Sequence, residues 1–407
     1  MTAKIRTTHV GSLPRTKELL EANRRRLASE IDAAEFDGIL QESVNSVVQR
    51  QLDLGIDIVN EGEYGHAMLD TVDYGSWWTY SFSRLGGLRP TDPAEPDAKG
   101  KIVRYTPGNV ELTTFDDRRD RAIFADAYAD PKSGIESGPK GGLYLPTIEQ
   151  PLSYVGQDAL AADLRHLGSA LESTGAAASG VEGFVAAVSP GSAARIRNLY
   201  YPTYAELLDA TAEVMSHEYK AIADAGYVVQ LDAPDLAEAF DQINPEPSYE
   251  DFRTYVRQNV DAINKSIEGI DPKLVRLHIC WGSWHGPHST DVPFEEIVDE
   301  ILQANVGGFT FEAANARHAA EWRVWKNRQL PEGTVIIPGV VSHSTNLIED
   351  PRLVADRIIQ FAELVGPDNV IASTDCGLGG RIHEQLAWAK LESLVKGAEI
   401  ATQELYS

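Results

Sequence analysis

The sequence predicts an α/β fold, a (β/α)8 barrel of the TIM type with a long insertion after its second strand. Eight apolar segments of strand length recur along the chain, and amphipathic segments of helical length separate most of them. A chain of 407 residues is long enough for one large barrel, and we expect a single barrel domain over residues 1–407. The predicted strands are residues 5–10, 56–63, 181–188, 228–232, 274–280, 308–312, 335–340 and 370–375.

The helical segments between these strands carry apolar side chains three or four positions apart. We expect helices at residues 204–225, 249–267, 351–365 and 384–401, with Pro351 in the first turn of its helix. Residues 80–156 are instead rich in Gly, Pro, Asp and Arg and show little periodicity. We interpret them as an insertion that serves as a lid, an oligomer contact or a disordered loop.

The charge of the chain limits its partners. With 36 basic and 61 acidic residues, the formal net charge is −25, which disfavours binding to nucleic acid. The sequence has no apolar run long enough to span a membrane, and its first residues lack the apolar core of a signal peptide. We therefore expect a cytoplasmic protein that acts on small molecules, and a homo-oligomer is compatible with the insertion.

The two cysteines of the chain both lie where a predicted strand ends. Cys280 follows His278 by two positions, so both side chains point to the same face of one strand. Cys376 directly follows another predicted strand, residues 370–375. Thiolate and imidazole are ligands that zinc prefers, so the sequence predicts a zinc site. A disulfide, two inert buried thiols and a purely structural zinc are the alternatives.

Other strand ends carry residues with chemistry of their own. Glu312 is either a fourth zinc ligand, completing a His-Cys-Glu-Cys set, or a cap of the next helix. His343 is either a proton donor or a hydrogen-bonded loop residue. Glu63 and Asp232 could together hold a substrate ammonium group, and Asp232 could instead cap a helix. In barrels of this type the strand ends meet at one pocket.

Three further features are open to more than one interpretation. His285 and His288 could form a second metal site, although a loop role is favoured. Trp281 and Trp284 could line the pocket or pack in the core. The glycine-rich segment 377–380 lacks the residues of a phosphate-binding loop and is interpreted as a turn.

Seven segments together resemble the catalytic barrel of the cobalamin-independent methionine synthase family, within the wider group of zinc thiol-alkyltransferase barrels. They are THVGSLP at 8–14, NEGE at 60–63, QLDAP at 230–234, HIC at 278–280, FEA at 311–313, PGVVSHS at 338–344 and DCGL at 375–378. The resemblance implies transfer of a methyl group from a methyltetrahydrofolate to the sulfur of homocysteine, in methionine biosynthesis. It also implies specific residue roles: zinc ligands His278, Cys280, Glu312 and Cys376; an ammonium site at Glu63 and Asp232; a carboxylate site at Gly11 and Ser12; and a general acid at His343.

The chain also departs from the family pattern. The family's Asp-Glu-Pro is Asp232-Ala233-Pro234 here, and its Val-His-Gly-Glu is NEGE at 60–63. Ser189 or Pro190 stands where a pterin-stacking tryptophan is expected, and the length leaves no room for the second barrel of the longer enzymes. These differences concern the donor rather than the zinc chemistry. Transfer from a non-folate donor and addition of coenzyme M to an epoxide are therefore alternatives. Coenzyme M would require a basic group, for which Arg15, Arg317 and Arg381 are candidates, whereas a zinc hydrolase is disfavoured because four protein ligands leave no position for water.

Overall fold

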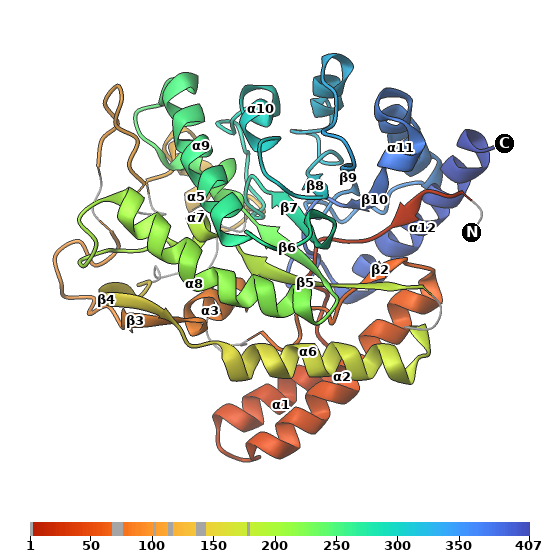
Figure 1. The fold of residues 1–407 in the computed structure, drawn as a ribbon, viewed down its shortest axis with the longest axis horizontal. Helices are drawn as coiled ribbons and strands as arrows, with labels where there is room; N and C mark the ends of the chain where they lie inside the picture. The colour runs from red at the N-terminus through yellow and green to blue at the C-terminus, as the bar shows by residue number, and fades with distance from the viewer. Residues whose placement is uncertain (1–2, 67–75, 101–102, 113–116, 136–143, 177–179) are drawn as a thin grey trace.

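Eight parallel strands form one sheet in the computed structural model, which describes residues 3–66, 76–100, 103–112, 117–135, 144–176 and 180–407. Their order in space is β1-β10-β9-β8-β7-β6-β5-β2, and each overlaps one predicted segment. The predicted barrel is therefore confirmed (Figure 1). The strands are β1 Arg6–Thr7, β2 Ile58–Val59, β5 Glu182–Val188, β6 Val228–Asp232, β7 Val275–Ile279, β8 Gly308–Phe311, β9 Val335–Val341 and β10 Ile371–Thr374.

The seam between the first and last strands of this order is closed without a regular ladder. The backbone N–H of Asp57 donates to the carbonyl of Thr7 at 3.1 Å, and the Asp57 carboxylate accepts the N–H of Thr7 at 2.9 Å. The hydroxyl of Thr8 donates to the carbonyl of Ile58 at 3.0 Å. Side chains thus satisfy backbone groups that a ladder would otherwise pair, and β1 and β2 stay short.

The helices surround the sheet, and α2 packs beside α6, α8 beside α9 and α11 beside α12 (Figure 1). Local sequence fixes where they begin. The Thr203 hydroxyl accepts the N–H of Glu206 at 3.2 Å while the Glu206 carboxylate accepts the N–H of Thr203 at 3.1 Å, a capping box that starts α8. Pro351 occupies the first turn of α11, as predicted. The helices are α1 Lys17–Leu27, α2 Ala33–Leu54, α3 Ser76–Ser83, α4 Arg119–Ile123, α5 Ala125–Ala129, α6 Gln157–Ser173, α7 Pro190–Ala193, α8 Tyr204–Asp224, α9 Tyr249–Ser266, α10 Val298–Ile301, α11 Pro351–Val365 and α12 Glu384–Leu405.

The insertion lies between β2 and β5, as the sequence predicts. It contains a two-stranded antiparallel sheet of β3, Leu85–Arg89, and β4, Thr147–Tyr154, which the weak periodicity of residues 80–156 did not reveal. The buried Arg84 guanidinium joins the base of the insertion to two barrel helices. It bonds to Asp163 of α6 at 2.8 Å and to Glu218 of α8 at 3.1 Å.

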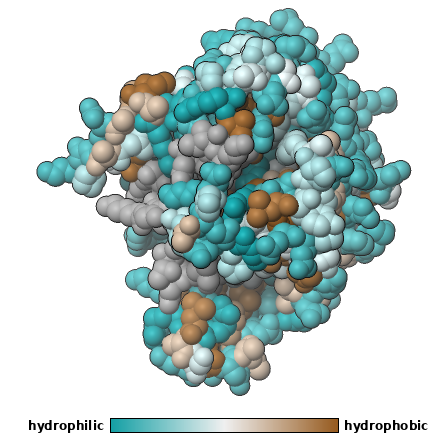
Figure 2. Space-filling view, turned by 90° about the vertical axis from the view of Figure 1, so that its left-hand side faces the viewer, coloured by the Kyte–Doolittle hydropathy of each residue, from teal (hydrophilic) through white to brown (hydrophobic). Residues whose placement is uncertain are grey.

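The surface agrees with the acidic composition. The face in Figure 2 is mostly hydrophilic, and its apolar residues form separate small patches. Among the described residues, no helix combines the length and apolar character that crossing a membrane requires.

Replacing Asp57 with alanine tests how the seam contributes to stability. The buried N–H of Thr7 would lose its acceptor, so we expect the free energy of unfolding to fall by about 1–3 kcal/mol, the cost of an unsatisfied buried donor. Urea denaturation followed by circular dichroism measures the change. Asp53→Ala on the exposed face of α2 is the matched control, and an equal effect of both substitutions would contradict the role given to Asp57.

Candidate metal centre

His278, Cys280 and Cys376 converge at the C-terminal ends of the barrel strands, as the sequence predicts. His278 lies on β7, Cys280 follows that strand directly, and Cys376 follows β10. One ligand atom from each lies within 4.8 Å of the other two, and the two sulfurs are 3.9 Å apart. Because β8 and β9 separate β7 from β10, the three ligands meet across the mouth of the barrel and not along one edge.

The chemistry of this Cys2His group fits zinc. His278 is only 2% exposed, and neither ring nitrogen has a hydrogen-bond partner of regular geometry among the described residues; its polar interaction is with the Cys376 sulfur, which helps to raise the pKa of His278. Buried polar atoms are rarely left without a partner, and a metal ion would supply one. A hydrogen bond from Cys280 holds the pKa of Cys376 well below its usual range, while the same contact raises that of Cys280. The contact thus favours the thiolate of Cys376 and the thiol of Cys280, and a bound cation would favour the thiolate form of both.

Glu312 lies beside the Cys2His group but outside it. Its two oxygens accept hydrogen bonds from the backbone N–H of Trp281 at 3.0 Å and from the side-chain amide of Asn315 at 2.7 Å. One oxygen also lies within 4.8 Å of ligand atoms of His343 and Asp375. Burial raises the pKa of Glu312 to about 7. Its place as the fourth ligand therefore stays a prediction.

Asp375 organises the centre, a role that the sequence reasoning missed. Its carboxylate accepts the backbone N–H groups of Ala313, Ala314 and Asn315, each at 2.8 Å. Asp375 precedes Cys376, and the three amides follow Glu312, so one carboxylate fixes the segments after β8 and β10 together. Its position directly before a candidate ligand at a strand end was the available signal in the sequence.

Glu63 and Asp232 are buried side chains beside the metal ligands. Burial raises the pKa of Glu63 to about 7, against an opposing effect of Arg15. Burial likewise raises the pKa of Asp232 to about 7, and the nearby His278 opposes this shift. The charge of Glu63 raises the pKa of Asp232, and Cys376 and His278 act on the pKa of both carboxylates, so the two belong to one electrostatic cluster with the Cys2His group.

The Gly11–Ser12 turn packs tightly against this cluster. A Cβ on Gly11 would lie 2.1 Å from a carboxylate oxygen of Glu63, and Gly11 has a φ of +118°, so only glycine fits there. The carbonyl of Ser12 accepts the N–H groups of Leu378 and Gly379 at 2.9 and 3.0 Å. The segment 377–380 is thus a turn, as its sequence indicates, and it packs against the segment that follows β1.

His343 is 2% exposed, and its Nδ1 makes no hydrogen bond to a described residue. Burial lowers the pKa of His343 to about 4. The ring is therefore neutral near pH 7 and is placed close to Glu312 and Asp375.

The aromatic residues after β7 are engaged in packing. Trp281 is fully buried, and its indole N–H donates to the carbonyl of Val292 at 2.8 Å, so it belongs to the core. The Trp284 ring contacts the Arg118 guanidinium, whose carbon lies 4.1 Å from the ring centroid, and stacks on the His288 ring at 3.9 Å. His288 also bonds to Asp291 at 3.0 Å, and the described residues show no metal group that includes His285 or His288.

Part of the insertion covers the loops that follow β6 and β7. Arg118 pairs with Glu238 and Asp241, and the hydroxyl of Tyr128 accepts the indole N–H of Trp284 at 2.9 Å. The backbone N–H of Glu238 in turn donates to the carbonyl of Cys280 at 3.3 Å. The insertion is therefore connected to the metal ligands through only one intermediate segment. Of the three roles predicted for this region, a lid, an oligomer contact or a disordered loop, these contacts favour the lid.

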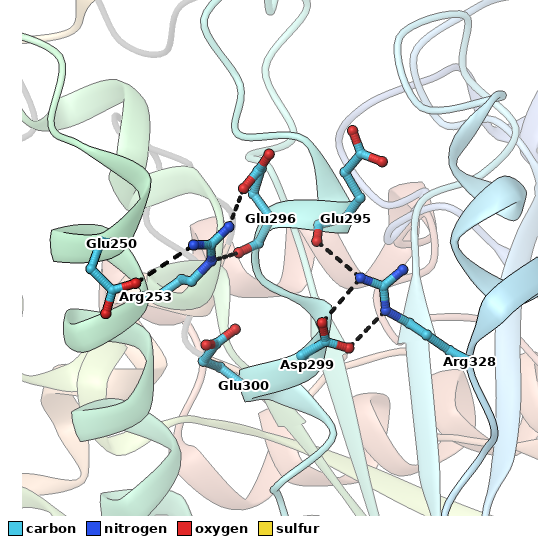
Figure 3. Close-up of a pocket in the computed structure, with 7 residues that line it drawn as sticks. All are labelled: Glu250, Arg253, Glu295, Glu296, Asp299, Glu300 and Arg328. Carbon is cyan, nitrogen blue, oxygen red and sulfur yellow. Dashed lines mark hydrogen bonds and ion pairs between the residues drawn. The ribbon is translucent and has the colours of Figure 1, made fainter.

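A surface pocket of about 610 Å³ lies apart from the candidate metal centre (Figure 3). Arginines pair with several of its acidic side chains, as where Arg328 bonds to Asp299 at 2.7 Å. None of the predicted site residues lines it. The lining residues are Glu250, Arg253, Glu295, Glu296, Asp299, Glu300 and Arg328.

A parallel eight-stranded barrel with a thiol-rich metal group at its strand ends defines a class of candidate metalloenzymes. Within that class, the chain belongs to the family described as "Cobalamin-independent synthase, Catalytic domain", whose model matches residues 5–74 and 193–400, more than half of the chain. The family consists of methyltransferase enzymes and uses zinc.

Individual relatives are distant. A methionine synthase of Sulfolobus acidocaldarius is 23% identical, over 98% of this chain and 93% of that protein. A 2-hydroxypropyl-CoM lyase of Xanthobacter autotrophicus is 27% identical over 36% of this chain and 45% of that protein. The structure of a B12-independent methionine synthase from a Shewanella species aligns over 99% of both chains with a TM-score of 0.67 at 19% identity, a likeness of fold.

Cys376→Ala tests the metal centre. We expect loss of at least about tenfold in zinc affinity, because one of three converging ligands is removed, while the barrel stays folded. Zinc content by atomic emission and the thermal unfolding midpoint measure the two effects. Ser373→Ala is the control, since this buried hydroxyl on β10 has no hydrogen-bond partner in the described structure. Retention of zinc by the Cys376 variant would contradict the assignment.

Proposed function

We propose that this protein transfers a methyl group from methyltetrahydrofolate, or a related donor, to the sulfur of homocysteine in a zinc-dependent reaction. The observation that supports this most is the Cys2His group in electrostatic contact with two buried carboxylates. The first fits an ion that binds a thiol, and the second fits the ammonium group of an amino acid. Homocysteine carries both.

His278, Cys280 and Cys376 would hold the zinc, with Glu312 as the fourth ligand. When bound, zinc lowers the pKa of a coordinated thiol, so that the nucleophilic thiolate is present at neutral pH. Glu312 is available for this role if it gives up a hydrogen bond from Trp281 or Asn315. Asp375 would keep the two segments that carry Glu312 and Cys376 at a fixed separation.

The substrate's ammonium group would bind Glu63 and Asp232, and its carboxylate would bind the Gly11–Ser12 turn. The positive charge compensates two carboxylates whose burial disfavours ionisation, so binding and ionisation support each other. We assign His343 as the proton donor to the departing group. Burial lowers the pKa of His343 to about 4, so its ring is neutral near pH 7 in the free protein. The ring would therefore have to be protonated when the methyl donor binds, before it can pass a proton to the departing group.

Addition of coenzyme M to an epoxide is the competing reaction. Its sulfonate would need a cation in the pocket. Two of the three candidates are already engaged. Arg317 donates to the carbonyl of Ser289 at 3.2 Å. Arg15 donates to the carbonyl of Glu63 at 2.9 Å, and its charge stabilises the ionised Glu63 carboxylate. The two carboxylates would also repel an anionic thiol. Homocysteine is therefore the better acceptor.

Zinc K-edge X-ray absorption tests the proposed activation of a thiol. We expect one additional sulfur ligand on the protein-bound zinc when homocysteine is added, because the substrate thiolate joins the ion. In parallel, methyltetrahydrofolate and other methyl donors are screened with homocysteine and coenzyme M as paired acceptors. An unchanged sulfur coordination with both thiols would mean that the metal does not activate the acceptor.

Asp232→Asn tests recognition of the amine. We expect the Kd of homocysteine to rise about tenfold or more, since a charged hydrogen bond is lost, while the Kd of 4-mercaptobutyrate, which lacks the amine, changes far less. Isothermal titration calorimetry on protein of verified zinc content provides both values. Equal weakening of the two thiols would remove the case for an amino-acid substrate.

The preference of the wild-type protein for homocysteine over 4-mercaptobutyrate should also depend on pH. Burial raises the pKa values of Glu63 and Asp232 to about 7, and only the ionised carboxylates attract an ammonium group. The preference should therefore be greatest above about pH 7 and decline as the pH falls through that value. Using the ratio of the two Kd values cancels the pH dependence of thiol coordination, which both ligands share. A ratio that is constant from pH 6 to 8 would contradict the ammonium site.

A further inference from the structure

Arg276 is a buried cation inside the barrel, two positions before His278 on β7. Its side chain shares the inward face of the strand with His278, because alternate residues of a strand point the same way. It is 3% exposed and forms no ion pair with any described residue. Barrel interiors are usually filled by apolar side chains, and an unpaired buried charge is costly. The presence of arginine at this depth therefore calls for an explanation beyond packing.

Every polar contact of the Arg276 guanidinium is to a neutral acceptor. Nε donates to the Gln230 side-chain oxygen at 2.9 Å, Nη1 to the Thr8 hydroxyl at 3.0 Å, and Nη2 to the His9 carbonyl at 2.9 Å. Its carbon lies 3.8 Å from the centroid of the Phe184 ring. Three hydrogen bonds and the contact with the Phe184 ring thus fix the position of the guanidinium.

These contacts fix the orientation of the Gln230 amide. Since a guanidinium can only donate, the amide must present its oxygen to Arg276 and turn its NH2 group away. That NH2 group donates to the Val10 carbonyl at 3.0 Å and to an oxygen of Asp232 at 2.8 Å. A reversed amide would bring two donors together at Arg276 and an oxygen against the Asp232 carboxylate. Arg276 therefore determines which group Asp232 meets.

The same guanidinium also connects the strands whose ends carry the proposed substrate contacts. Gln230 is on β6, which ends at Asp232, and His9 follows β1, two residues before Gly11. The Thr8 hydroxyl that accepts from Arg276 donates in turn to the Ile58 carbonyl of β2, at the seam of the barrel. One side chain on the metal-ligand strand thus donates to two side chains, those of Gln230 and Thr8, and to the backbone carbonyl of His9.

We propose that Arg276 and Gln230 form a positioning pair that orients the Asp232 carboxylate toward the ammonium group of the substrate. This rests on the proposed function, in which Asp232 binds that group. The pair acts from below the pocket and does not touch the substrate. It would determine specificity for thiols that carry an amine, whereas coordination of the thiol depends on the metal ligands.

The test uses Arg276→Met, Gln230→Leu and the double variant, each as full-length protein of verified zinc content. Each single substitution should raise the Kd of homocysteine about tenfold, or ~1.4 kcal/mol, and that of 4-mercaptobutyrate by less than about threefold. Because both residues act through the same hydrogen bond to Asp232, the double variant should be no weaker than either single one. The KM for homocysteine should rise while kcat at saturation changes by less than about threefold.

Thr310→Val is the matched control. Thr310 pairs with His278 in the neighbouring strand, is 1% exposed, and its hydroxyl has no hydrogen-bond partner among the described residues. It changes a buried polar residue of the same barrel without touching the pair, so both Kd values should stay at the wild-type level. If Arg276→Met does not fold, Gln230→Leu alone decides, because it removes the hydrogen bond to Asp232 and leaves Arg276 in place.

Two results would overturn the inference while leaving the proposed function intact. One is a wild-type preference for homocysteine that survives both substitutions. The other is an increase in Kd that multiplies in the double variant, or that is equal for homocysteine and 4-mercaptobutyrate. Either pattern is what a general loss of structure would produce. A wild-type protein that binds the two thiols equally would overturn the proposed function itself, and with it the role of the pair.

Discussion

The hydrogen bonds of Asp375 are the interaction on which the candidate site most depends. Two candidate ligands, Glu312 and Cys376, lie on segments that are far apart in sequence and follow different strands. A single carboxylate brings these segments together by accepting three backbone N–H groups after Glu312. Such a contact is strong because each amide would otherwise be a buried donor without a partner. The metal centre is thus built on a backbone interaction that does not itself involve the metal.

A second constraint is the amount of negative charge that the barrel mouth contains. Burial raises the pKa of Glu63, Asp232 and Glu312 to about 7. Near neutral pH, each of these carboxylates is therefore close to the point at which it takes up a proton. Cations would relieve this: a metal ion at the Cys2His group and an ammonium group between Glu63 and Asp232. The electrostatic cost of the unliganded pocket and its affinity for cationic ligands have the same origin.

Two groups of contacts position the strand ends: those of Arg276 inside the barrel, and those of the insertion with the loops after β6 and β7. Inside the barrel, Arg276 donates to the Gln230 side chain on β6 and to the carbonyl of His9 after β1, and so connects these two segments. On the insertion side, Arg118 and Tyr128 contact Trp284, which also stacks on His288, so this indole is engaged in protein contacts. The geometry of the strand ends is therefore defined both by the barrel interior and by residues outside the barrel.

The sequence determined the barrel, because the apolar patterns of strands and helices are local features of the chain. The strands of a parallel sheet are buried on both faces, and their apolar runs can therefore be recognised in the sequence. It also identified His278 and Cys280 as one ligand pair, since alternate residues of a strand share a face. It likewise predicted Cys376 as a further ligand, and the tertiary structure brings Cys376 to this pair. Only the tertiary structure decided that Glu312 keeps both oxygens in protein hydrogen bonds and that Trp281 belongs to the core. The Asp375 and Arg276 contacts also had no signal in local periodicity. These outcomes depend on which strands become neighbours in the closed barrel and on which polar groups are left to pair there, and neither is encoded within a single segment of the chain.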